Sequence, residues 1–321
     1  MEMKLQTSRR NPFAVVFLPF LGRLHRNSFR SGRANGSSLG RLYSRLLFYP
    51  IKALSFAPVL GKIEVTVGEQ VRSASFDARN RQFSALYFDV FSDGYEPELT
   101  TIIDALVPDD GIIFDIGSNW GFFAVFLASR SGFVGHIHAF EPWPSTYSDL
   151  TGLVNELQLS KRITCHEVAL SDNSGHASMC SPSHSGLAHV SSDGSGRKVR
   201  TVSLDTLDLP PPNLIKIDAE GLEEKILNGG LGLLEKNRPM LLFENRPSKF
   251  GGEECMAVLF MLEQIGYSLF APQLSPSMGE TCQLDLISIS AETRREHARH
   301  PNLFACHSTK LDQIKKVADR K

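Results

Sequence analysis

Short apolar runs alternate with longer segments of mixed polarity from residue 111 to residue 289, and this pattern predicts an α/β fold. Each run has the length of a strand buried on both faces, and most intervening segments are long enough for a helix. Such alternation favours right-handed crossovers and a mostly parallel sheet with helices on both faces. The predicted strands cover residues 112–114, 135–140, 163–170, 213–217, 240–243, 267–271 and 284–289. The predicted helices cover residues 122–128, 145–159, 220–235 and 253–265.

Three further regions surround this core. Residues 63–90 alternate in polarity as a β-hairpin would, and residues 99–106 have apolar positions at helical spacing after a proline. Residues 173–200 are rich in Ser and Gly and form a polar insertion, which is a candidate lid. We therefore predict an N-terminal extension over 1–62, lead-in strands over 63–98, and a main domain over 99–321.

The segment 111–121, G-I-I-F-D-I-G-S-N-W-G, joins the first predicted strand to a helix through a glycine-rich turn. Glycines there let the backbone pass close to a ligand, since a Cβ atom would collide with it. The spacing is G-x-x-x-G rather than the G-x-G-x-x-G of dinucleotide sites, and Asp115 stands just before it. A fixed carboxylate repels a pyrophosphate but suits a cationic ligand such as S-adenosylmethionine. An ordinary strand-to-helix turn is the alternative.

Acidic residues follow each of the first five predicted strands. In open α/β sheets the ligand binds in the crevice at the carboxyl ends of the strands, so we expect these carboxylates to converge on one cleft. Glu141, after the second strand, is predicted to accept both hydroxyls of a ribose. Asp172, after the third strand, is predicted to accept a hydrogen bond from an adenine amino group. The five acids are Asp115, Glu141, Asp172, Asp218 and Glu244.

Lys216 interrupts the apolar strand at 213–217 and is costly to bury unless it is paired. Strand alternation puts Lys216 and Asp218 on the same side, so Asp218 is its nearest candidate partner. One interpretation is a buried ion pair that orients the turn. The other is that Lys216, Asp218, Glu220 and Glu244 face a methyl acceptor, with Asp218 or Glu220 as the general base and Lys216 orienting it. Asp218, Glu220 and Glu244 would be hard oxygen ligands for a divalent ion, although no spacing of these residues demands one.

The composition is typical of a globular chain, with 321 residues of which 42% are hydrophobic and 21% charged. Its five cysteines are scattered and never in C-x-x-C spacing, which predicts reduced thiols in a cytoplasmic protein. The net charge of −1 hides an asymmetry, because residues 1–62 hold eleven Lys/Arg and one acid, which leaves −11 for the remainder. An acidic body argues against nucleic acid as a partner.

The basic residues 1–62 contain an apolar run at 13–21, which is too short to span a membrane and has no cleavage site after it. A poorly ordered leader and a transit peptide both fit this composition. Weak peripheral attachment to the inner membrane surface through clustered Lys/Arg is a third interpretation. The sequence gives no indication of an oligomeric state.

Six motifs, in this order, resemble the FkbM-type family of S-adenosylmethionine-dependent methyltransferases: F-D-I-G-S-N-W-G, A-F-E-P, A-L-S-D, V-S-L-D, I-K-I-D-A-E-G and F-E. The resemblance runs from about residue 95 to about residue 271. It implies a class I, Rossmann-like methyltransferase fold with a mostly parallel, seven-stranded twisted sheet, and S-adenosylmethionine as the methyl donor. It also implies O-methylation of a hydroxyl on a sugar, a glycan or a polyketide-like product.

The resemblance also implies roles for residues by position. Glu141 would hold the ribose of the cofactor and Asp172 the adenine, and the turn after the first strand would hold the methionine part. Ser118 stands where the family often has Ala, and Trp120 replaces an aliphatic residue and is expected to narrow the cleft. The turn residues are Asp115, Gly117, Ser118, Asn119 and Gly121.

Two other functions compete with this one. A nicotinamide-dependent oxidoreductase or epimerase would share the sheet and the ribose-binding acid, but this sequence lacks the G-x-G-x-x-G motif. A non-catalytic binding module would keep the fold, but the intact acids after the strands argue against it. The fold alone does not determine the acceptor.

Overall fold

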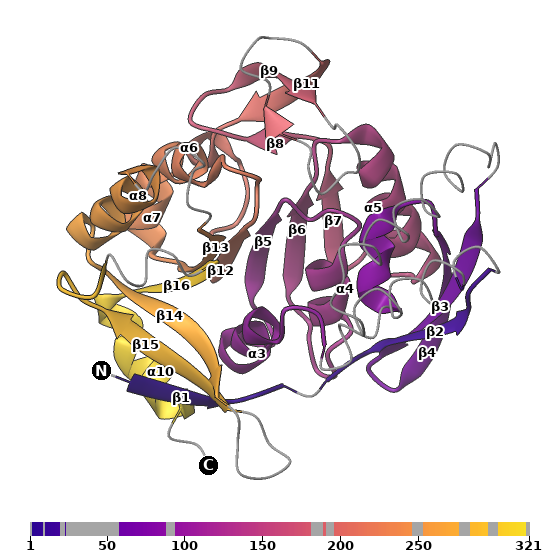
Figure 1. The fold of residues 1–321 in the computed structure, drawn as a ribbon, viewed down its shortest axis with the longest axis horizontal. Helices are drawn as coiled ribbons and strands as arrows, with labels where there is room; N and C mark the ends of the chain where they lie inside the picture. Colours follow the sequence, from indigo (N-terminus) through magenta and orange to yellow (C-terminus); the bar gives the residue numbers. More distant parts are fainter. Residues whose placement is uncertain are drawn as a thin grey trace, which may run out of the picture.

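The computed structural model describes residues 2–8, 10–19, 23, 58–87, 94–180, 189–190, 196–245, 253–275, 283–294 and 301–318. These residues form a nine-stranded central sheet with helices on both faces (Figure 1). A three-stranded sheet and a four-stranded sheet lie at its periphery. In this part of the chain, no helix is long and apolar enough to cross a membrane.

Five parallel strands make the middle of the central sheet, in the order β7-β6-β5-β12-β13. The predicted parallel sheet is thereby confirmed. The strand order reverses between β5 and β12, and such sheets bind ligands in the crevice at this point. Alternate side chains enter two hydrophobic cores, with Ile113 in one and Phe114 in the other. The strands are β5 (Ile112–Ile116), β6 (His136–Phe140), β7 (Ile163–His166), β12 (Leu214–Ile217) and β13 (Met240–Glu244).

Beyond β13, four more strands follow in the order β16-β14-β15-β1. β16 is antiparallel to both β13 and β14, and it separates these two strands, which run in the same direction. A dinucleotide-binding Rossmann sheet has the strand order 3-2-1-4-5-6, with no such strand between the last two. The sheet has nine strands rather than the predicted seven because β16 and β1 join it. These four strands are β1 (Glu2–Gln6), β14 (Tyr267–Ser275), β15 (Gln283–Ile289) and β16 (Asn302–His307).

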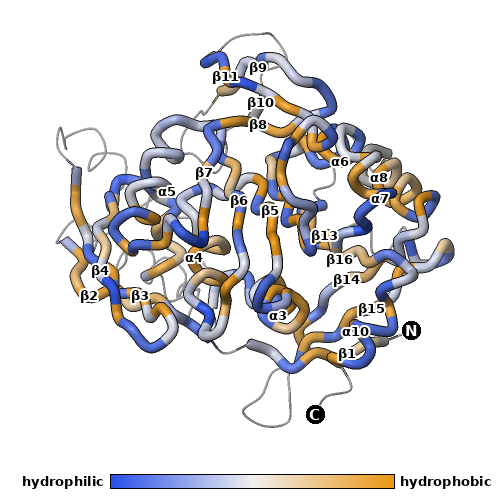
Figure 2. Tube along the Cα trace, turned by 180° about the vertical axis from the view of Figure 1, so that it is seen from behind, coloured by the Kyte–Doolittle hydropathy of each residue, from blue (hydrophilic) through white to orange (hydrophobic). Residues whose placement is uncertain are grey.

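The two cores place four helices, α3, α4, α5 and α10, on one face of the sheet and three, α6 to α8, on the other. α4 is buried along its whole length, and its apolar sequence is orange in Figure 2. The single helix predicted over 220–235 is instead α6 and α7. The chain turns between them at Gly229, where a Cβ atom would lie 2.2 Å from the carbonyl oxygen of Ser171. The helices are α3 (Pro97–Leu106), α4 (Phe122–Ala128), α5 (Pro144–Glu156), α6 (Glu223–Asn228), α7 (Leu231–Asn237), α8 (Glu253–Gln264) and α10 (Leu311–Ala318).

The N-terminal region contributes to two sheets. The predicted hairpin is β3 (Leu60–Val67) and β4 (Gln70–Asp77), and β2 (Phe13–Phe17) pairs with β3. β1 pairs with β15 at the edge of the central sheet. Residues 2–6 and 13–17 are therefore part of the folded domain, which corrects the division that set 1–62 apart as an extension. Residues 20–22 and 24–57, which hold most of the basic residues of that segment, lie outside the described residues.

The polar insertion forms a small sheet of its own. β9 (Gly175–Cys180) pairs with β10 (His189–Val190) and with β11 (Arg197–Val202), and β11 pairs with β8 (Ala169–Leu170). The strand predicted over 163–170 is thus divided, since β7 belongs to the central sheet and β8 to this insertion sheet. Ala169, Met179 and Val199 form its core.

Candidate active site

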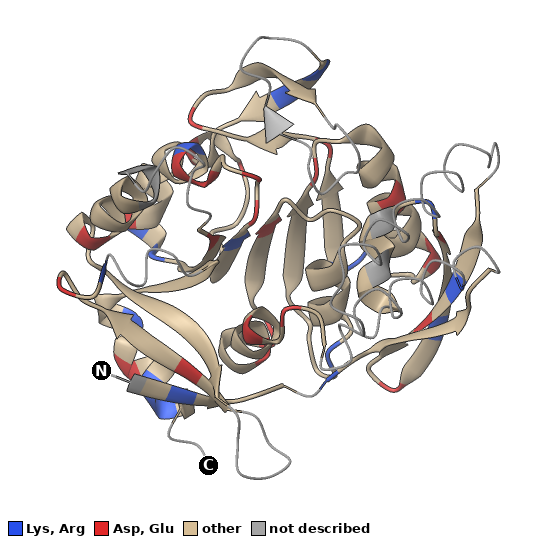
Figure 3. Cartoon of the chain, viewed as in Figure 1, with Lys and Arg blue, Asp and Glu red and all other residues tan. Residues whose placement is uncertain are grey.

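A cavity of about 300 Å³ lies at the carboxyl ends of the parallel strands. Its walls come from the turn after β5, the loops after β6 and β12, the start of α3, and strands β8 and β9 of the insertion sheet. Figure 3 shows acidic residues around this end of the central sheet and at the start of α3. The acids that line the cavity are Glu96, Glu141, Asp218, Glu220 and Glu244.

Hydrogen bonds hold the turn after β5 in shape. The amides of Gly117 and Ser118 both donate to the carbonyl of Phe140 at 3.0 Å, and the Ser118 hydroxyl donates to the carbonyl of Asp115 at 2.6 Å. Gly117 has φ +71°, and a Cβ atom there would lie 1.8 Å from the carbonyl oxygen of Asp218. Only glycine lets this turn approach the loop after β12 so closely.

Glu141 is buried beside this turn, with 7% of its surface exposed. One carboxylate oxygen accepts the amide of Asn119 at 3.0 Å, and the other accepts the amide of Trp143 at 2.8 Å. Burial raises the pKa of Glu141 to about 7, although these two backbone donors act in the opposite direction. A carboxylate has about four acceptor positions, so Glu141 retains capacity for two hydroxyls of a ligand.

Lys216 lies at the centre of a buried charge cluster. Its Nζ donates to the carbonyl of Gly117 at 3.0 Å, and lies 3.3 Å from Asp115 Oδ1 and 3.7 Å from Asp218 Oδ2. Burial alone would lower the pKa of Lys216, but the carboxylates of Asp115 and Asp218 outweigh it and raise that pKa. The ammonium therefore stays protonated, and it orients its neighbours rather than accepting a proton.

Three of the residues expected at the ligand do not line the cavity. Asp115 is 1% exposed and faces Lys216 from the adjacent strand. Gly121 has φ +97° and starts α4, and a Cβ atom there would lie 2.5 Å from Leu150 Cδ1 in α5. Asp172 is exposed and accepts a hydrogen bond from the neighbouring Ser171 hydroxyl at 3.0 Å. These positions correct the expectation that all five acids after the strands converge on one cleft.

The other predicted site residues do come together at the cavity. They include the strand residue Lys216 and the acids that follow three of the parallel strands. Two apolar residues of β8, Ala169 and Leu170, also line the wall. The predicted residues in the lining are Gly117, Ser118, Asn119, Glu141, Lys216, Asp218, Glu220 and Glu244.

Sequence reasoning missed part of the cavity lining, which includes Tyr95, Glu96, Phe123 and Met179. Glu96 precedes a predicted helix, and an acid before a proline at a helix start is normally interpreted as a helix-terminus feature. Met179 lies in the insertion, where no pattern indicated a strand. The lining also has three non-glycine residues with positive φ: Glu96, Asn119 and Glu220. Left-handed conformations of this kind are enriched at functional sites.

Trp120 forms part of the cavity wall but is itself mostly buried, at 3% exposure. Its indole N–H donates to the carbonyl of Gln82 at 3.2 Å, and its ring lies 4.8 Å from the ring of Phe83, centroid to centroid. Phe13 of β2 contacts the same ring edge-on. Strand β2 of the three-stranded sheet and residues 82–83, which follow β4, thus support the turn after β5.

The charge of the cavity determines which ligands fit. Among the described lining residues there are five carboxylates and one cation, Lys216, whose charge is already balanced by Asp115 and Asp218. A pyrophosphate would meet this acidic surface without a free cationic partner. A ligand with an ammonium and a sulfonium suits it, and a ribose suits Glu141. The described residues therefore fit S-adenosylmethionine.

Residues 115–269, just under half of the chain, match the family model described as the methyltransferase FkbM domain. This segment belongs to the FkbM methyltransferase family. A relative of this FkbM domain is the hexuronic acid methyltransferase AglP of Haloferax volcanii, with 32% identity over 134 residues. That match covers 40% of this chain and 53% of AglP, so the chain spans about half the length of this relative.

Two solved methyltransferases also match parts of this chain. The crystal structure of methyltransferase FkbM from Methylobacillus flagellatus KT has 18% identity and a TM-score of 0.39, over 55% of this chain and 44% of that one. Precorrin-6Y C5,15-methyltransferase from Geobacter metallireducens GS-15 has 13% identity and a TM-score of 0.36, over 65% and 89%. These scores are low, and the architecture is defined instead by the order of the strands.

Proposed function

We propose that this protein transfers a methyl group from S-adenosylmethionine to a hydroxyl of a sugar or glycan. The observation that carries the proposal is the charge of the cavity, in which five carboxylates surround one lysine that is already paired. Membership of the FkbM family supports methyl transfer as the reaction. A cationic donor and a polyhydroxylated acceptor both suit a surface rich in carboxylate acceptors.

One side of the cavity suits the cofactor. The turn residues Gly117, Ser118 and Asn119 would hold its methionine part and Glu141 its ribose, while Ala169 and Leu170 would contact the adenine ring. When bound, S-adenosylmethionine supplies a methyl group on a positively charged sulfur. We call the lining formed by Gly117, Ser118, Asn119, Glu141, Ala169 and Leu170 the cofactor half.

The opposite side suits the acceptor. Sugar hydroxyls are weak nucleophiles at neutral pH, and a carboxylate that accepts the hydroxyl proton helps the oxygen to attack. Lys216 fixes Asp218 through its ion pair and fixes the cofactor half through the Gly117 carbonyl. We call the lining formed by Tyr95, Glu96, Asp218, Glu220 and Glu244 the acceptor half.

A sugar acceptor is favoured by the relative AglP, whose name specifies a hexuronic acid. Because the match covers 53% of AglP, the acceptor of this protein is proposed by chemical class only. Polyketide-like hydroxyls remain the other class that the family resemblance implies.

The test is incorporation of methyl-labelled S-adenosylmethionine into a glycan extract of cells from which the gene has been deleted. With the purified protein, we expect label in a monosaccharide released by hydrolysis, as a methyl ether. The same methyl ether should be present in glycans of cells with the gene and absent without it. Label found only in non-carbohydrate products, or no label at all, would contradict the proposed acceptor.

A further inference from the structure

Glu96 enters the cavity from the start of α3 in an uncommon backbone conformation. Its φ of 45° and ψ of 64° lie in the left-handed region, although the next residue is Pro97. Residues before a proline avoid helical conformations, and a left-handed conformation is strained for a residue other than glycine. Such a conformation persists where the surrounding structure fixes it, so the placement of this carboxylate at the cavity is imposed by the fold.

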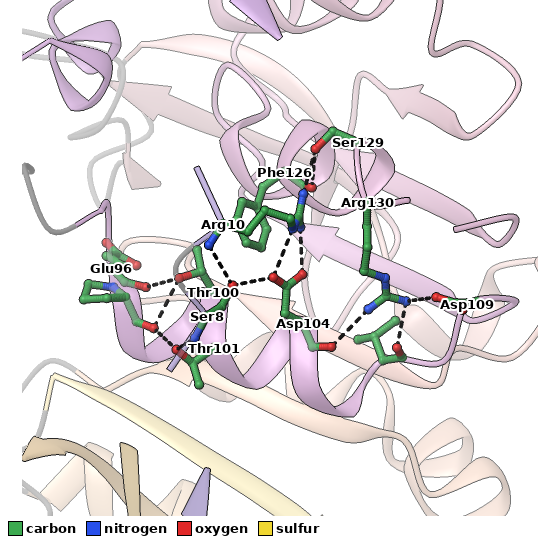
Figure 4. Close-up of polar contacts among 12 residues, drawn as sticks. Ser8, Arg10, Glu96, Thr100, Thr101, Asp104, Asp109, Phe126, Ser129 and Arg130 are labelled. Atoms are coloured by element: carbon green, nitrogen blue, oxygen red, sulfur yellow. Dashed lines mark hydrogen bonds and ion pairs between the residues drawn. The ribbon is translucent and has the colours of Figure 1, made fainter. Parts of the chain in front are cut away.

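The N-terminal segment supplies part of this constraint by bracing α3 against α4 (Figure 4). Arg10 donates two hydrogen bonds to the carboxylate of Asp104 in α3, at 2.7 and 3.0 Å, and one to the Ser129 hydroxyl after α4, at 2.8 Å. The Arg10 guanidinium also lies 3.9 Å above the Phe126 ring of α4. Ser8 donates its amide to Thr101 of α3 at 3.1 Å. We call these contacts the N-terminal brace.

Two other carboxylates of the cavity are already engaged in contacts within the protein. Glu141 accepts two backbone amides in the cofactor half, and Asp218 is the ion-pair partner of Lys216. Glu96 lies within electrostatic range of both Asp218 and Lys216, so it faces the same part of the cavity. Glu96 reaches the cavity from the start of α3, which the N-terminal brace holds, whereas Asp218 reaches it from the loop after β12.

The surroundings of Glu96 also favour proton acceptance near neutral pH. Burial raises the pKa of Glu96 to about 7, Asp218 and Glu98 act in the same direction, and Lys216 and a hydrogen bond from Tyr95 act against them. A general base works best when its pKa is near the working pH.

We propose that Glu96 is the general base of methyl transfer, a role that rests on the proposed function. The acceptor oxygen forms a bond to the methyl carbon as the carbon–sulfur bond breaks, and the electron pair of that bond stays on sulfur. The hydroxyl proton passes to a carboxylate oxygen of Glu96 and then to solvent. The products are the methyl ether and S-adenosylhomocysteine.

The test compares Glu96→Gln with Glu98→Gln in the full chain. Glu98 lies two residues further along α3, outside the cavity lining, and accepts a hydrogen bond from Asn302 at 3.4 Å. Two quantities are measured for each variant: the rate of label transfer to the glycan extract of deletion cells, and the calorimetric affinity for S-adenosylhomocysteine. We expect Glu96→Gln to lower the rate at least 100-fold while its affinity stays within about threefold of the wild type. Glu98→Gln should change neither by more than about twofold.

Two results would overturn the role of Glu96. One is normal transfer by Glu96→Gln, and in that case loss of transfer in Glu220→Gln or Glu244→Gln would identify the base instead. The other is loss of S-adenosylhomocysteine binding together with transfer, which would assign Glu96 to the cofactor half. Failure of the wild-type protein itself to bind S-adenosylhomocysteine or to transfer label would overturn the proposed function instead.

Discussion

The two halves of the cavity are built in different ways. The cofactor half comes from segments that directly follow β5 and β6, together with two residues of β8. The acceptor half combines the start of α3 with the loop after β12 and the end of β13, which are far apart in the sequence. The cofactor half is thus specified by local motifs, whereas the acceptor half depends on tertiary contacts such as the N-terminal brace. Mutations should therefore affect the cofactor half and the acceptor half separately.

The largest effect is expected at Lys216, because its ammonium contacts both halves. Lys216→Met would leave the buried carboxylate of Asp115 without its cationic partner, and we expect the free energy of unfolding to fall by about 3–5 kcal/mol. Urea denaturation measures this change. The control is Lys315→Met, which removes an exposed ion pair with Asp312 at 3.0 Å and should cost less than about 1 kcal/mol. Equal losses in the two variants would contradict the central position of Lys216.

The close approach of the two halves is tested by Gly117→Ala. The added Cβ atom would lie 1.8 Å from the Asp218 carbonyl at a φ of +71°, so we expect a loss of about 3 kcal/mol in the free energy of unfolding. Gly152→Ala is the matched control, since no atom lies within 4 Å of the new Cβ in α5. Alanine there should stabilise the protein by about 0.5–1 kcal/mol. A tolerated Gly117→Ala would show that the two halves are not in contact through this turn.

The cofactor half alone is tested by Glu141→Gln. An amide cannot accept both backbone donors and both ribose hydroxyls, so the affinity for S-adenosylhomocysteine should fall about 100-fold, or about 2.7 kcal/mol. Asp172→Asn is the control, because Asp172 is exposed and outside the cavity lining. Its affinity should stay within about twofold of the wild type. The reverse order of effects would restore Asp172 as the ligand of the adenine.

A smaller effect is expected in the pH dependence of cofactor affinity, which should follow the ionisation of Glu141. With the pKa of Glu141 raised to about 7, its ionised form is lost as the pH falls through that value, and cofactor affinity should decrease by up to about tenfold per pH unit. In the ligand-free protein the sign is opposite. Stability from this group is fully present below the ordinary value of 4.5 and is lost as the pH rises through about 7. Calorimetry from pH 5.5 to about 8 should show a slope that Glu141→Gln lacks.

The smallest effect is expected at the N-terminal brace, which should influence the acceptor half alone. Arg10→Gln removes the charged hydrogen bonds to Asp104, so transfer should fall about three- to tenfold while affinity for S-adenosylhomocysteine is unchanged. Arg79→Gln is the control, since it removes a comparable ion pair with Asp77, at 2.6 Å, that does not involve α3. If both variants lowered transfer equally, the N-terminal brace would contribute only to overall stability and would have no specific influence on the acceptor half.

Much of the central sheet could be predicted from the sequence, because its inner strands are contiguous apolar runs that end at acids. β5, β6, β12 and β13 were found for this reason. β1 could not be found, since its alternation rests on only Met3 and Leu5, which are buried by pairing with β15. β16 pairs only with strands that precede it in the chain, β13 and β14, so its place in the sheet depends on contacts between distant segments.

Each half of the cavity was predicted in part, since Asp218, Glu220 and Glu244 of the acceptor half line the cavity as expected, whereas Glu96 was missed and Asp115 was wrongly expected at the ligand. Period-two alternation places a residue on one side of a strand but does not say which neighbour lies across from it. Asp115 faces Lys216 because the two residues are in register on adjacent strands, although they are far apart in the sequence. Glu96 enters the cavity because distant residues hold α3 in place. Neither of these two arrangements can be recognised from a local pattern in the sequence.

Calorimetric titration of the purified full-length protein tests the central claim, that the acidic cavity takes a cationic nucleoside and rejects phosphates. S-adenosylmethionine and S-adenosylhomocysteine are titrated separately, with NADH as the phosphorylated comparison. We expect both sulfur compounds to bind with dissociation constants in the micromolar range and NADH to give no heat of binding. Binding of NADH with no binding of either sulfur compound would contradict the account.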